Sequence, residues 1–335
     1  MASISDYKLL TIIIPTFNRC EQVKQNLDLT IPQVLEHQDY VRIYISDNAS
    51  TDGTSEMSRE YLEKYPNNIF YFCQPQNITA SPNFNHAVHA VNSEYVYILG
   101  DDDLLFPNFV QTVLGLIKNN PEIGLFHFNY LLGLNGSINC RLLHTRVDLQ
   151  QCLKKYEDGK QFILEHLNGP SFISSNLFKR ELWVNGVKSI KEDCCGYVWF
   201  SILLYGCLDY KCAYYNTPVL LQRFPAKNPY SKNFPLYYIV GLGRLFKYLN
   251  ACCDGLYDKW IDYSQRNNFR NLLILISRVV YYRKFYKEKQ KDVICYLKTP
   301  VSRVYFSLCL LPLPKFVMGK VAPFVVRSLK ICGFN

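Results

Sequence analysis

The chain has 335 residues, 49% of them hydrophobic, so it can bury the core of one large domain or two modest ones. Its formal net charge of +9 is compatible with nucleic acid, a membrane surface or a polyanionic substrate such as a nucleotide diphosphate. We expect no secretion signal, because the first residues show no basic stretch followed by an apolar core. The 13 cysteines form no C-x-x-C pair, which argues against a disulfide scaffold or a zinc site and favours reduced thiols.

The first hundred residues alternate between strand and helix patterns. Runs of β-branched and aromatic residues predict strands at 10–14, 41–46, 69–72 and 94–99, with helices from 21, from 54 to 64 and from 81 to 90. This alternation predicts an α/β fold with a mostly parallel sheet that helices cover on both faces. The carboxyl ends of parallel strands meet at one edge, so we expect the loops at 15–19, 47–53 and 101–103 to converge.

Three consecutive aspartates, Asp101, Asp102 and Asp103, directly follow the fourth predicted strand. Adjacent carboxylates repel one another and cost stability unless positive charge lies beside them. A divalent cation meets that requirement, and ligands bind at this edge of α/β sheets. The alternative is a helix N-cap, since Pro107 begins a plausible helix, but a single Asp would fulfil that role. The pattern therefore favours a site for a divalent cation with oxygen ligands.

Two common nucleotide-binding motifs are missing from the sequence. The turn after the first predicted strand is Pro-Thr-Phe-Asn-Arg, where a Rossmann fold carries G-x-G-x-x-G, and no Walker A loop occurs. Hydride transfer and P-loop chemistry are therefore disfavoured.

Several motifs resemble those of family 2 glycosyltransferases. Residues 11–19 (Thr-Ile-Ile-Ile-Pro-Thr-Phe-Asn-Arg) and 47–54 (Asp-Asn-Ala-Ser-Thr-Asp-Gly-Thr) are similar to the family's opening motifs. Asn77 and Asn85 precede the acidic motif at the usual spacing, and residues 192–193 (Glu-Asp) lie where the family carries its E-D motif. The resemblance covers the N-terminal two thirds of the chain. It implies the GT-A fold and a nucleotide-sugar donor, and the form Leu-Gly-Asp-Asp-Asp resembles the O-antigen branch that includes abequosyltransferases.

One position departs from the family pattern. The family motif is D-x-D-D, and alignment places Gly100 where the first Asp is expected. Asp102 then takes the second acidic position, which ordinarily contacts the metal, and Asp103 follows. The resemblance thus implies Asp102 and Asp103 as metal ligands. Asp101 would replace the missing carboxylate or contact the sugar or ribose.

The resemblance also implies a nucleotide pocket and a catalytic base. Asp47 would hydrogen-bond the nucleotide base, and the other motif residues would bind the nucleotide-sugar beside it: Pro15, Thr16, Asn18, Arg19, Asn48, Asp52, Asn77 and Asn85. Asp193 would take the proton of the acceptor hydroxyl, with Glu192 as the alternative. Without the resemblance, residues 47–53 are better explained as an ordinary Asx- and Gly-rich turn, and Asp193 equally well as a helix cap.

The middle of the chain is expected to face the acceptor. Residues 169–176 are the predicted acceptor-side loop and strand. In the basic segment that follows 222, Arg223, Lys227 or Lys232 could close over the pyrophosphate, although a solvated connector explains the segment equally well. The Q-x-x-R-W element and membrane spans of processive family members are missing, so we expect one sugar to be added per encounter.

We divide the chain into a nucleotide-sugar-binding half (1–130), an acceptor-binding half with the E-D motif (131–232) and a helical extension (233–335). In the extension, the apolar run 304–314 contains two prolines and is shorter than the roughly 20 residues of a membrane span. Basic and apolar residues then alternate up to Lys330, which suits the inner face of the cytoplasmic membrane. A helix pair packed on the catalytic domain is the alternative.

These features predict an inverting, metal-dependent glycosyltransferase of bacterial surface polysaccharide synthesis (O-antigen, lipopolysaccharide or capsule). It would move one sugar, abequosyl-like or another, from a nucleotide-sugar to a lipid-linked acceptor of the undecaprenyl diphosphate type. A nucleic-acid-binding protein is disfavoured because the acidic sheet edge would repel a polyanion, so we expect no nucleic-acid partner. A sugar-phosphate nucleotidyltransferase is disfavoured because its Gly-rich N-terminal loop with Arg and Pro-Lys is missing.

Overall fold

The computed structural model describes residues 7–134, 137–142, 152–167, 169–190, 198–223, 236–267, 276, 279 and 282–311. The chain divides into two compact units. The first contains residues 1–191 and 198–228, and the second contains residues 192–197 and 229–335. The first unit contains the β-sheets, whereas the described part of the second is helical.

The first unit begins with the predicted alternation of strands and helices. The strands are β1 (Lys8–Thr16), β2 (Val41–Asp47), β3 (Ile69–Cys73) and β4 (Ser93–Ile98), and the helices between them are α1 (Cys20–Leu35), α2 (Thr54–Lys64) and α3 (Ala80–Ala90). Every residue of β2 is buried, which is typical of a parallel strand with helices on both faces. The pattern in the sequence therefore located these elements to within about two residues.

The remaining elements of the first unit are shorter. They are β5 (Leu104–Leu105), α4 (Phe109–Asn119), β6 (Ile123–Phe128), β7 (Leu131–Leu134), β8 (Ser137–Leu142), β9 (Leu153–Tyr156), α5 (Gly159–His166), the 3₁₀ turns η1 (Gly169–Ser171) and η2 (Ile173–Ser175), β10 (Asn176–Lys179), α6 (Arg180–Ser189), α7 (Val198–Cys207), β11 (Lys211–Tyr215) and β12 (Leu220–Arg223). The helix expected from Pro107 begins at Phe109 instead, after the short strand β5.

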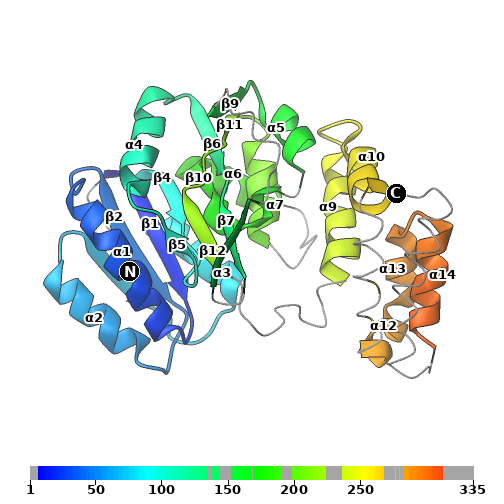
Figure 1. The fold of residues 1–335 in the computed structure, drawn as a ribbon, viewed down its shortest axis with the longest axis horizontal. Coiled ribbons are helices and arrows are strands. Elements are labelled where there is room, and N and C mark those ends of the chain that lie inside the picture. Colours follow the sequence, from blue (N-terminus) through cyan, green and yellow to red (C-terminus); the bar gives the residue numbers. More distant parts are fainter. Residues whose placement is uncertain are drawn as a thin grey trace. The chain divides into compact units, whose positions relative to one another are not determined.

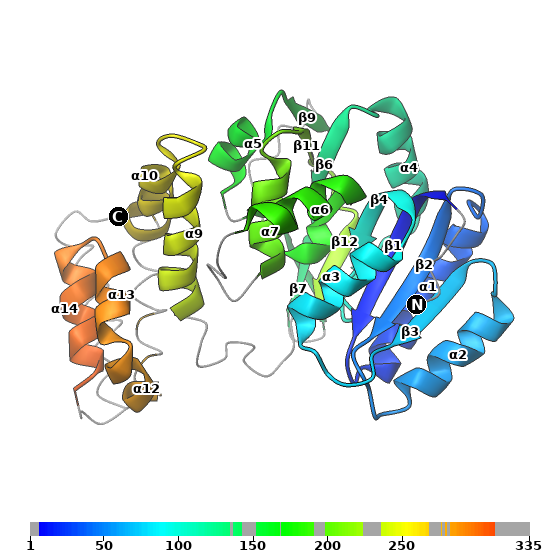
Figure 2. The same cartoon turned by 180° about the vertical axis from the view of Figure 1, so that it is seen from behind.

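An eight-stranded sheet with the order β3-β2-β1-β4-β10-β6-β11-β9 forms the centre of the unit. Strands β1 to β4 pair in parallel, as do β6 and β11, whereas β10 is antiparallel to both β4 and β6. Helices α1 and α4 cover one face (Figure 1), and α3, α6 and α7 cover the other (Figure 2). A smaller sheet has the order β5-β12-β7-β8.

The register of the parallel strands brings the motif loops together. Thr16, the last residue of β1, pairs with Asp47, the last residue of β2, and Ile13 of β1 pairs with Ile98 at the end of β4. The loops that follow these strands therefore leave the sheet side by side. The predicted convergence at the carboxyl edge is what the structure shows.

The second unit consists of short helices around an apolar core. They are the π-helical turn η3 (Tyr237–Gly241), α9 (Leu242–Leu249), α10 (Leu256–Ile261), η4 (Asp262–Asn267), α12 (Arg283–Glu288), α13 (Gln290–Tyr296) and α14 (Pro300–Cys309). Tyr286 and Phe306 are buried at its centre. Within the part of the chain that the structure describes, no helix is both long and apolar enough to cross a membrane.

Two glycines allow α6 and α7 to pack closely. A Cβ at Gly186 would lie 2.1 Å from the carbonyl oxygen of Ile202, and a Cβ at Gly206 would lie 2.3 Å from that of Leu182. These contacts are shorter than any real Cβ approach, so the two helices cross at a distance that only glycine permits.

We predict that Gly186→Ala lowers the free energy of unfolding by about 1–3 kcal/mol, because the helices must separate to admit the methyl group. Gly115→Ala in α4 is the matched control, since a Cβ there would meet nothing within 4 Å. That change should stabilise the protein by about 0.5–1 kcal/mol through helix propensity. Chemical denaturation measures both values, and equal effects would contradict the packing described here.

Candidate active site

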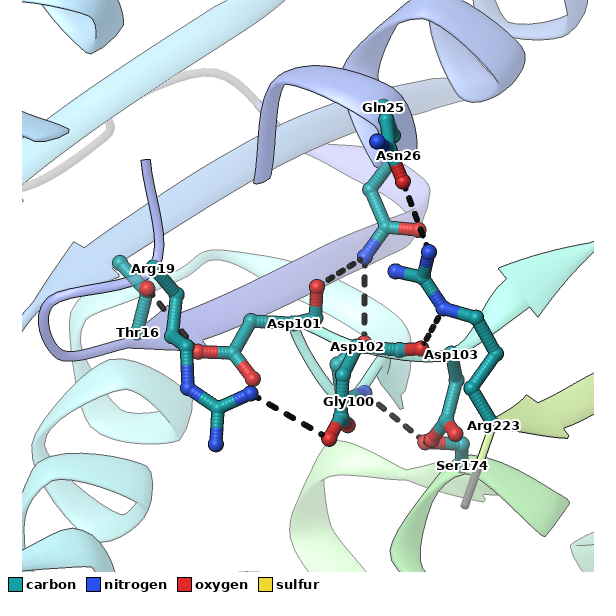
Figure 3. Close-up of polar contacts among 10 residues, drawn as sticks. All are labelled: Thr16, Arg19, Gln25, Asn26, Gly100, Asp101, Asp102, Asp103, Ser174 and Arg223. Carbon is teal, nitrogen blue, oxygen red and sulfur yellow. Dashed lines mark hydrogen bonds and ion pairs between the residues drawn. The ribbon is translucent and has the colours of Figure 1, made fainter. Parts of the chain in front are cut away.

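The acidic residues lie in a tight turn that follows β4 (Figure 3). The main-chain N–H of Asp103 donates to the carbonyl of Gly100 at 3.1 Å and closes the turn. The three carboxylates leave it in different directions and contact different parts of the domain. This divergence reduces their mutual repulsion and gives each carboxylate its own environment.

Asp103 points into the domain and anchors the turn. The residue is 3% exposed, and its Oδ2 accepts a hydrogen bond of 2.6 Å from the Ser174 hydroxyl, which itself accepts from the N–H of Gly100 at 2.8 Å. Burial raises the pKa of Asp103 to about 8, although the Ser174 hydrogen bond opposes the shift. In this geometry Asp103 holds the turn together, and its assignment as a metal ligand stays a sequence-based prediction.

Gly100 is the position where the family motif carries Asp. A Cβ at Gly100 would lie 2.6 Å from Oδ2 of Asp103 and 3.1 Å from the Ser174 hydroxyl oxygen. A larger residue would therefore push Asp103 out of its buried place. The glycine and the inward direction of Asp103 depend on each other.

Asp101 joins the acidic turn to the loop after β1. Its Oδ2 accepts a hydrogen bond of 3.0 Å from the Thr16 hydroxyl. Burial, followed by the negative charge of Asp102, raises the pKa of Asp101 to about 6, while the positive charge of Arg19 opposes this shift. Two of the predicted nucleotide-sugar-binding residues, Thr16 and Asp101, are thus in direct contact.

Asp102 is the accessible carboxylate of the turn. Its side chain is 37% exposed, and its Oδ2 lies 3.5 Å from Nη1 of Arg19, which is itself 45% exposed. Two charges so open to water stabilise each other little, so a ligand can displace the pair at small cost.

The donor set fits a divalent cation that arrives with its substrate. Among the residues that the structure describes, no three His, Cys, Asp or Glu side chains form a metal-binding group. Mg²⁺, and by the same oxygen chemistry Mn²⁺, is commonly held by one or two carboxylates together with substrate phosphates and water. Asp102 can supply such a carboxylate, with the remaining ligands coming from a diphosphate and water.

Asp47 organises the predicted nucleotide loop from within. It is fully buried, its Oδ1 accepts from the N–H (2.9 Å) and hydroxyl (2.6 Å) of Ser50, and its Oδ2 accepts from the hydroxyl of Tyr71 at 2.9 Å. Asn18, in the left-handed region at φ 54°, accepts through Oδ1 from the N–H of Thr51 at 2.7 Å. These bonds fasten the loop after β1 to the loop after β2.

Asn48 and Asn77 link the same loop to the segment before α3. Nδ2 of Asn48 donates to Oδ1 of Asn77 at 3.1 Å, and Oδ1 of Asn48 accepts from the N–H of Ile78 at 2.9 Å. Asn77 also accepts from the N–H of Thr79 at 2.8 Å. The two predicted binding residues therefore form one hydrogen-bonded pair beside Asp47.

Asn85 contacts helix α6, whereas Asn48 and Asn77 contact each other. Its Oδ1 accepts from the indole N–H of Trp183 at 3.2 Å, which directs it toward α6. On the same helix, Asn83 is buried and bonds both Ser46 (2.9 Å) and Gln74 (3.2 Å). Asn83 rather than Asn85 therefore supports the end of β2, and the nucleotide-sugar role of Asn85 stays a prediction.

Asp52 connects the first turns of two helices. Its Oδ2 accepts from the N–H of Cys20, the first residue of α1, at 3.1 Å, and its Oδ1 accepts from the N–H (3.2 Å) and hydroxyl (2.5 Å) of Thr54, the first residue of α2. Burial alone would raise the pKa of Asp52, but these hydrogen bonds outweigh it and hold the pKa below its ordinary value. Asp52 thus caps both helices.

Two further predicted binding residues, Pro15 and Arg223, lie in the described part of the chain. Pro15 is buried in β1 and pairs with Ser46 of β2. Arg223 donates through Nη1 to Gln25 and through Nε to the main-chain carbonyl of Asp102, so its side chain is fixed to the acidic turn. Four residues with predicted roles lie outside the described part of the chain: Lys227, Lys232, Glu192 and Asp193.

Sequence reasoning did not single out Asn26, Tyr71 or Ser174. Asn26 and Tyr71 lie within an ordinary helix and an ordinary strand, and only their contacts distinguish them. Ser174 belongs to the predicted acceptor-side segment, but its bond to Asp103 joins residues 71 positions apart. A single sequence gives no signal for such a contact.

A segment of the first unit matches a known protein family. Residues 11–161 match the family model described as glycosyl transferase family 2. This segment is a family 2 glycosyltransferase domain. Over 117 residues the chain is 38% identical to the abequosyltransferase RfbV of Salmonella typhimurium, a match that spans 35% of each protein.

Solved structures show the same fold across more of the chain. TarS 1–349 of S. aureus in complex with UDP superposes with a TM-score of 0.56 at 14% identity, covering 96% of this chain and 91% of that one. The mannosyltransferase PcManGT from Pyrobaculum calidifontis, in complex with GDP-Man and Mn²⁺, gives a TM-score of 0.51 at 15% identity, covering 92% and 87%. These likenesses confirm the predicted GT-A fold of the family 2 domain.

We predict that Asp52→Asn destabilises the protein by about 1 kcal/mol, because an amide nitrogen cannot accept the N–H of Cys20. Since the pKa of folded Asp52 lies below its ordinary value of 3.8, the carboxylate stabilises the fold above about pH 4. This contribution is lost as the pH falls through the folded pKa.

The difference in unfolding free energy between wild type and Asp52→Asn should therefore be constant near neutral pH and shrink below about pH 4. Urea unfolding from pH 7 to pH 3 measures it, with Asp39→Asn at an exposed position as the control. A difference that grows in acid would show that Asp52 does not cap the helices as a carboxylate.

Proposed function

We propose that this protein is an inverting glycosyltransferase that moves one sugar from a nucleotide-sugar to a lipid-linked oligosaccharide, using Mn²⁺ or Mg²⁺. The observation that carries the proposal is the exposed carboxylate of Asp102, held beside Arg19 at the carboxyl edge of a family 2 domain. A diphosphate at this edge would meet one carboxylate suited to a cation and one guanidinium suited to phosphate oxygens.

The chain's residues bind and orient the donor. The chemistry that Mn²⁺ or Mg²⁺ supplies when bound is neutralisation of the charge that develops on the leaving nucleoside diphosphate. Asp102 would hold the cation, and Arg19, released from Asp102, would turn to the phosphates. Asp47, Asn48 and Asn77 fix the loop against which the nucleoside would lie.

The acceptor hydroxyl needs a base, because its pKa lies far above 7. Asp193 would take that proton as the oxygen attacks the anomeric carbon, with Glu192 as the alternative. A single displacement of this kind inverts the configuration at that carbon. The assignment rests on the resemblance of the E-D motif.

The identities of donor and acceptor rest on likeness. The similarity to an abequosyltransferase supports a dideoxyhexosyl donor, and the solved structures with the same fold bind UDP or GDP-Man. The similarity to the abequosyltransferase also supports a lipid-linked acceptor of the undecaprenyl diphosphate type. Such an acceptor is used in the synthesis of a bacterial surface polysaccharide such as O-antigen. Such an acceptor would place the enzyme at the inner face of the cytoplasmic membrane.

One helix of the second unit supports contact with a membrane. On α14 and just after it, four apolar side chains are 38%, 60%, 40% and 45% exposed: Val301, Val304, Leu308 and Leu311. Their spacing of three and four residues places them on one side of the helix, while Tyr305 and Phe306 face the core. The basic and apolar residues after 311, on which the sequence prediction rests, lie outside the described part of the chain.

We expect Asp102→Asn to abolish the thermal shift that a nucleoside diphosphate with Mn²⁺ produces, because the amide keeps the shape of the carboxylate and loses its charge. Sugar transfer should fall with it, and EDTA should have the same effect on the wild type. Asp39→Asn, at an exposed position, serves as the control carboxylate. Undiminished transfer by Asp102→Asn, or in EDTA, rules out the assignment.

For the base, Asp193→Asn should lower turnover by at least ~10²-fold and leave donor binding nearly intact. Single-turnover transfer and nucleotide binding measure the two effects. If Glu192→Gln is the damaging change instead, the two roles are exchanged. If neither change matters, another group removes the proton.

The double change Val304→Glu and Leu308→Glu should weaken binding of the full chain to anionic liposomes at low salt by about tenfold or more, since charge opposes burial of an apolar face. High salt should weaken binding of the wild type, because each Lys or Arg near anionic lipid adds about 1 kcal/mol. Leu29→Glu, at an exposed apolar position of α1, is the control. Equal binding by the wild type and the double variant would show that α14 does not contact the membrane.

A further inference from the structure

Side chains from two other elements hold three consecutive carbonyls of the acidic turn. Asn26 of α1 donates through Nδ2 to the carbonyls of Gly100 (3.2 Å) and Asp101 (3.0 Å). Arg223, the last residue of β12, donates through Nε to the carbonyl of Asp102. Figure 3 shows the two donors reaching the turn from α1 and from β12. The main chain that carries the carboxylates is therefore fixed on both sides.

The Arg223 side chain is itself held in place. Its Nη1 donates to Oε1 of Gln25 at 2.7 Å, and Gln25 precedes Asn26 on α1. The main-chain N–H of Arg223 also bonds the Asp103 carboxylate. The planar guanidinium can bond Gln25 and the Asp102 carbonyl together, a geometry that the single ammonium group of lysine does not reproduce.

Arg223 reaches Asp102 through the main chain and leaves its carboxylate available. In the described part of the chain, the ion pair of Asp102 is made with Arg19. The Nη2 atom of Arg223 is buried and has no hydrogen-bond partner among the described residues. A buried donor without a partner costs stability, which offsets part of what the hydrogen bonds from Nε and Nη1 contribute to the fold.

We propose that Arg223 is a positioning residue for the cation site: it fixes the Asp102 main chain so that the carboxylate points outward toward a cation and diphosphate. This inference rests on the proposed function and replaces the predicted role of Arg223 as a group that closes over the pyrophosphate. Mg²⁺-type sites require near-ideal ligand geometry, so a turn free to shift would bind the cation more weakly. Supporting residues of this kind typically change metal affinity by about 10–100-fold.

The test is a Mn²⁺ titration of the full chain, followed by electron paramagnetic resonance of the free ion. UDP, GDP, CDP and dTDP are tried in turn, and the one that best promotes Mn²⁺ binding to the wild type is used. Arg223→Met, which keeps the length of the side chain and removes its donors, should raise the half-saturating Mn²⁺ concentration by at least ~10-fold. Arg59→Met on the exposed part of α2 is the matched control and should leave it unchanged.

Binding of the nucleotide without metal and the melting temperature separate positioning from a structural role, because both should stay near wild-type values in Arg223→Met. An unchanged Mn²⁺ affinity in that variant overturns the inference. The inference also fails if the variant loses Mn²⁺ affinity and loses nucleotide affinity without metal to the same extent. If Arg223→Met does not fold, Arg223→Lys is tested in its place. We expect this variant to bind Mn²⁺ at least ~10-fold more weakly than the wild type. Mn²⁺ binding with wild-type affinity would contradict the inference. A wild-type protein that binds no Mn²⁺ with any nucleotide contradicts the proposed function itself.

Discussion

Repulsion among three adjacent carboxylates is the constraint around which this site is built. The turn after β4 places Asp101, Asp102 and Asp103 next to one another, and the fold separates their charges by sending each in a different direction. Asp103 is buried against Ser174, Asp101 bonds Thr16, and Asp102 is left facing solvent. Only one of the three carboxyl groups is thereby offered to a ligand, although all three shape the turn.

The same turn depends on residues that carry no charge. Gly100 provides the space that the buried carboxylate of Asp103 occupies, and Asn26 fixes the carbonyls on one side. Beside it, Asp47 and Asp52 use their carboxylates to tie loops and helix ends together. Much of the acidic and amide content of the motifs thus builds the edge of the sheet, and a smaller part remains free to meet a substrate.

The sequence was sufficient to predict β1 to β4 and the convergence of the motif loops at one edge of the sheet. The β-branched runs located β1 to β4, and parallel pairing then placed the motif loops at one edge. Three adjacent aspartates could not reveal which of them is buried, because that depends on Ser174 and Gly100 meeting in three dimensions. The antiparallel insertion of β10 and the hydrogen bond from Arg223 to the turn could not be predicted either, because both join residues that are far apart in the sequence.

We propose that Asp102, the exposed carboxylate of the turn, faces a divalent cation while Asp103 stays bonded to Ser174. Anomalous diffraction from crystals grown with Mn²⁺ and a nucleoside diphosphate tests it most directly. We expect a manganese peak within bonding distance of a carboxylate oxygen of Asp102, with diphosphate oxygens among the other ligands and Asp103 still bonded to Ser174. A manganese ion coordinated by Asp103, or a bound diphosphate with no metal at Asp102, would contradict it.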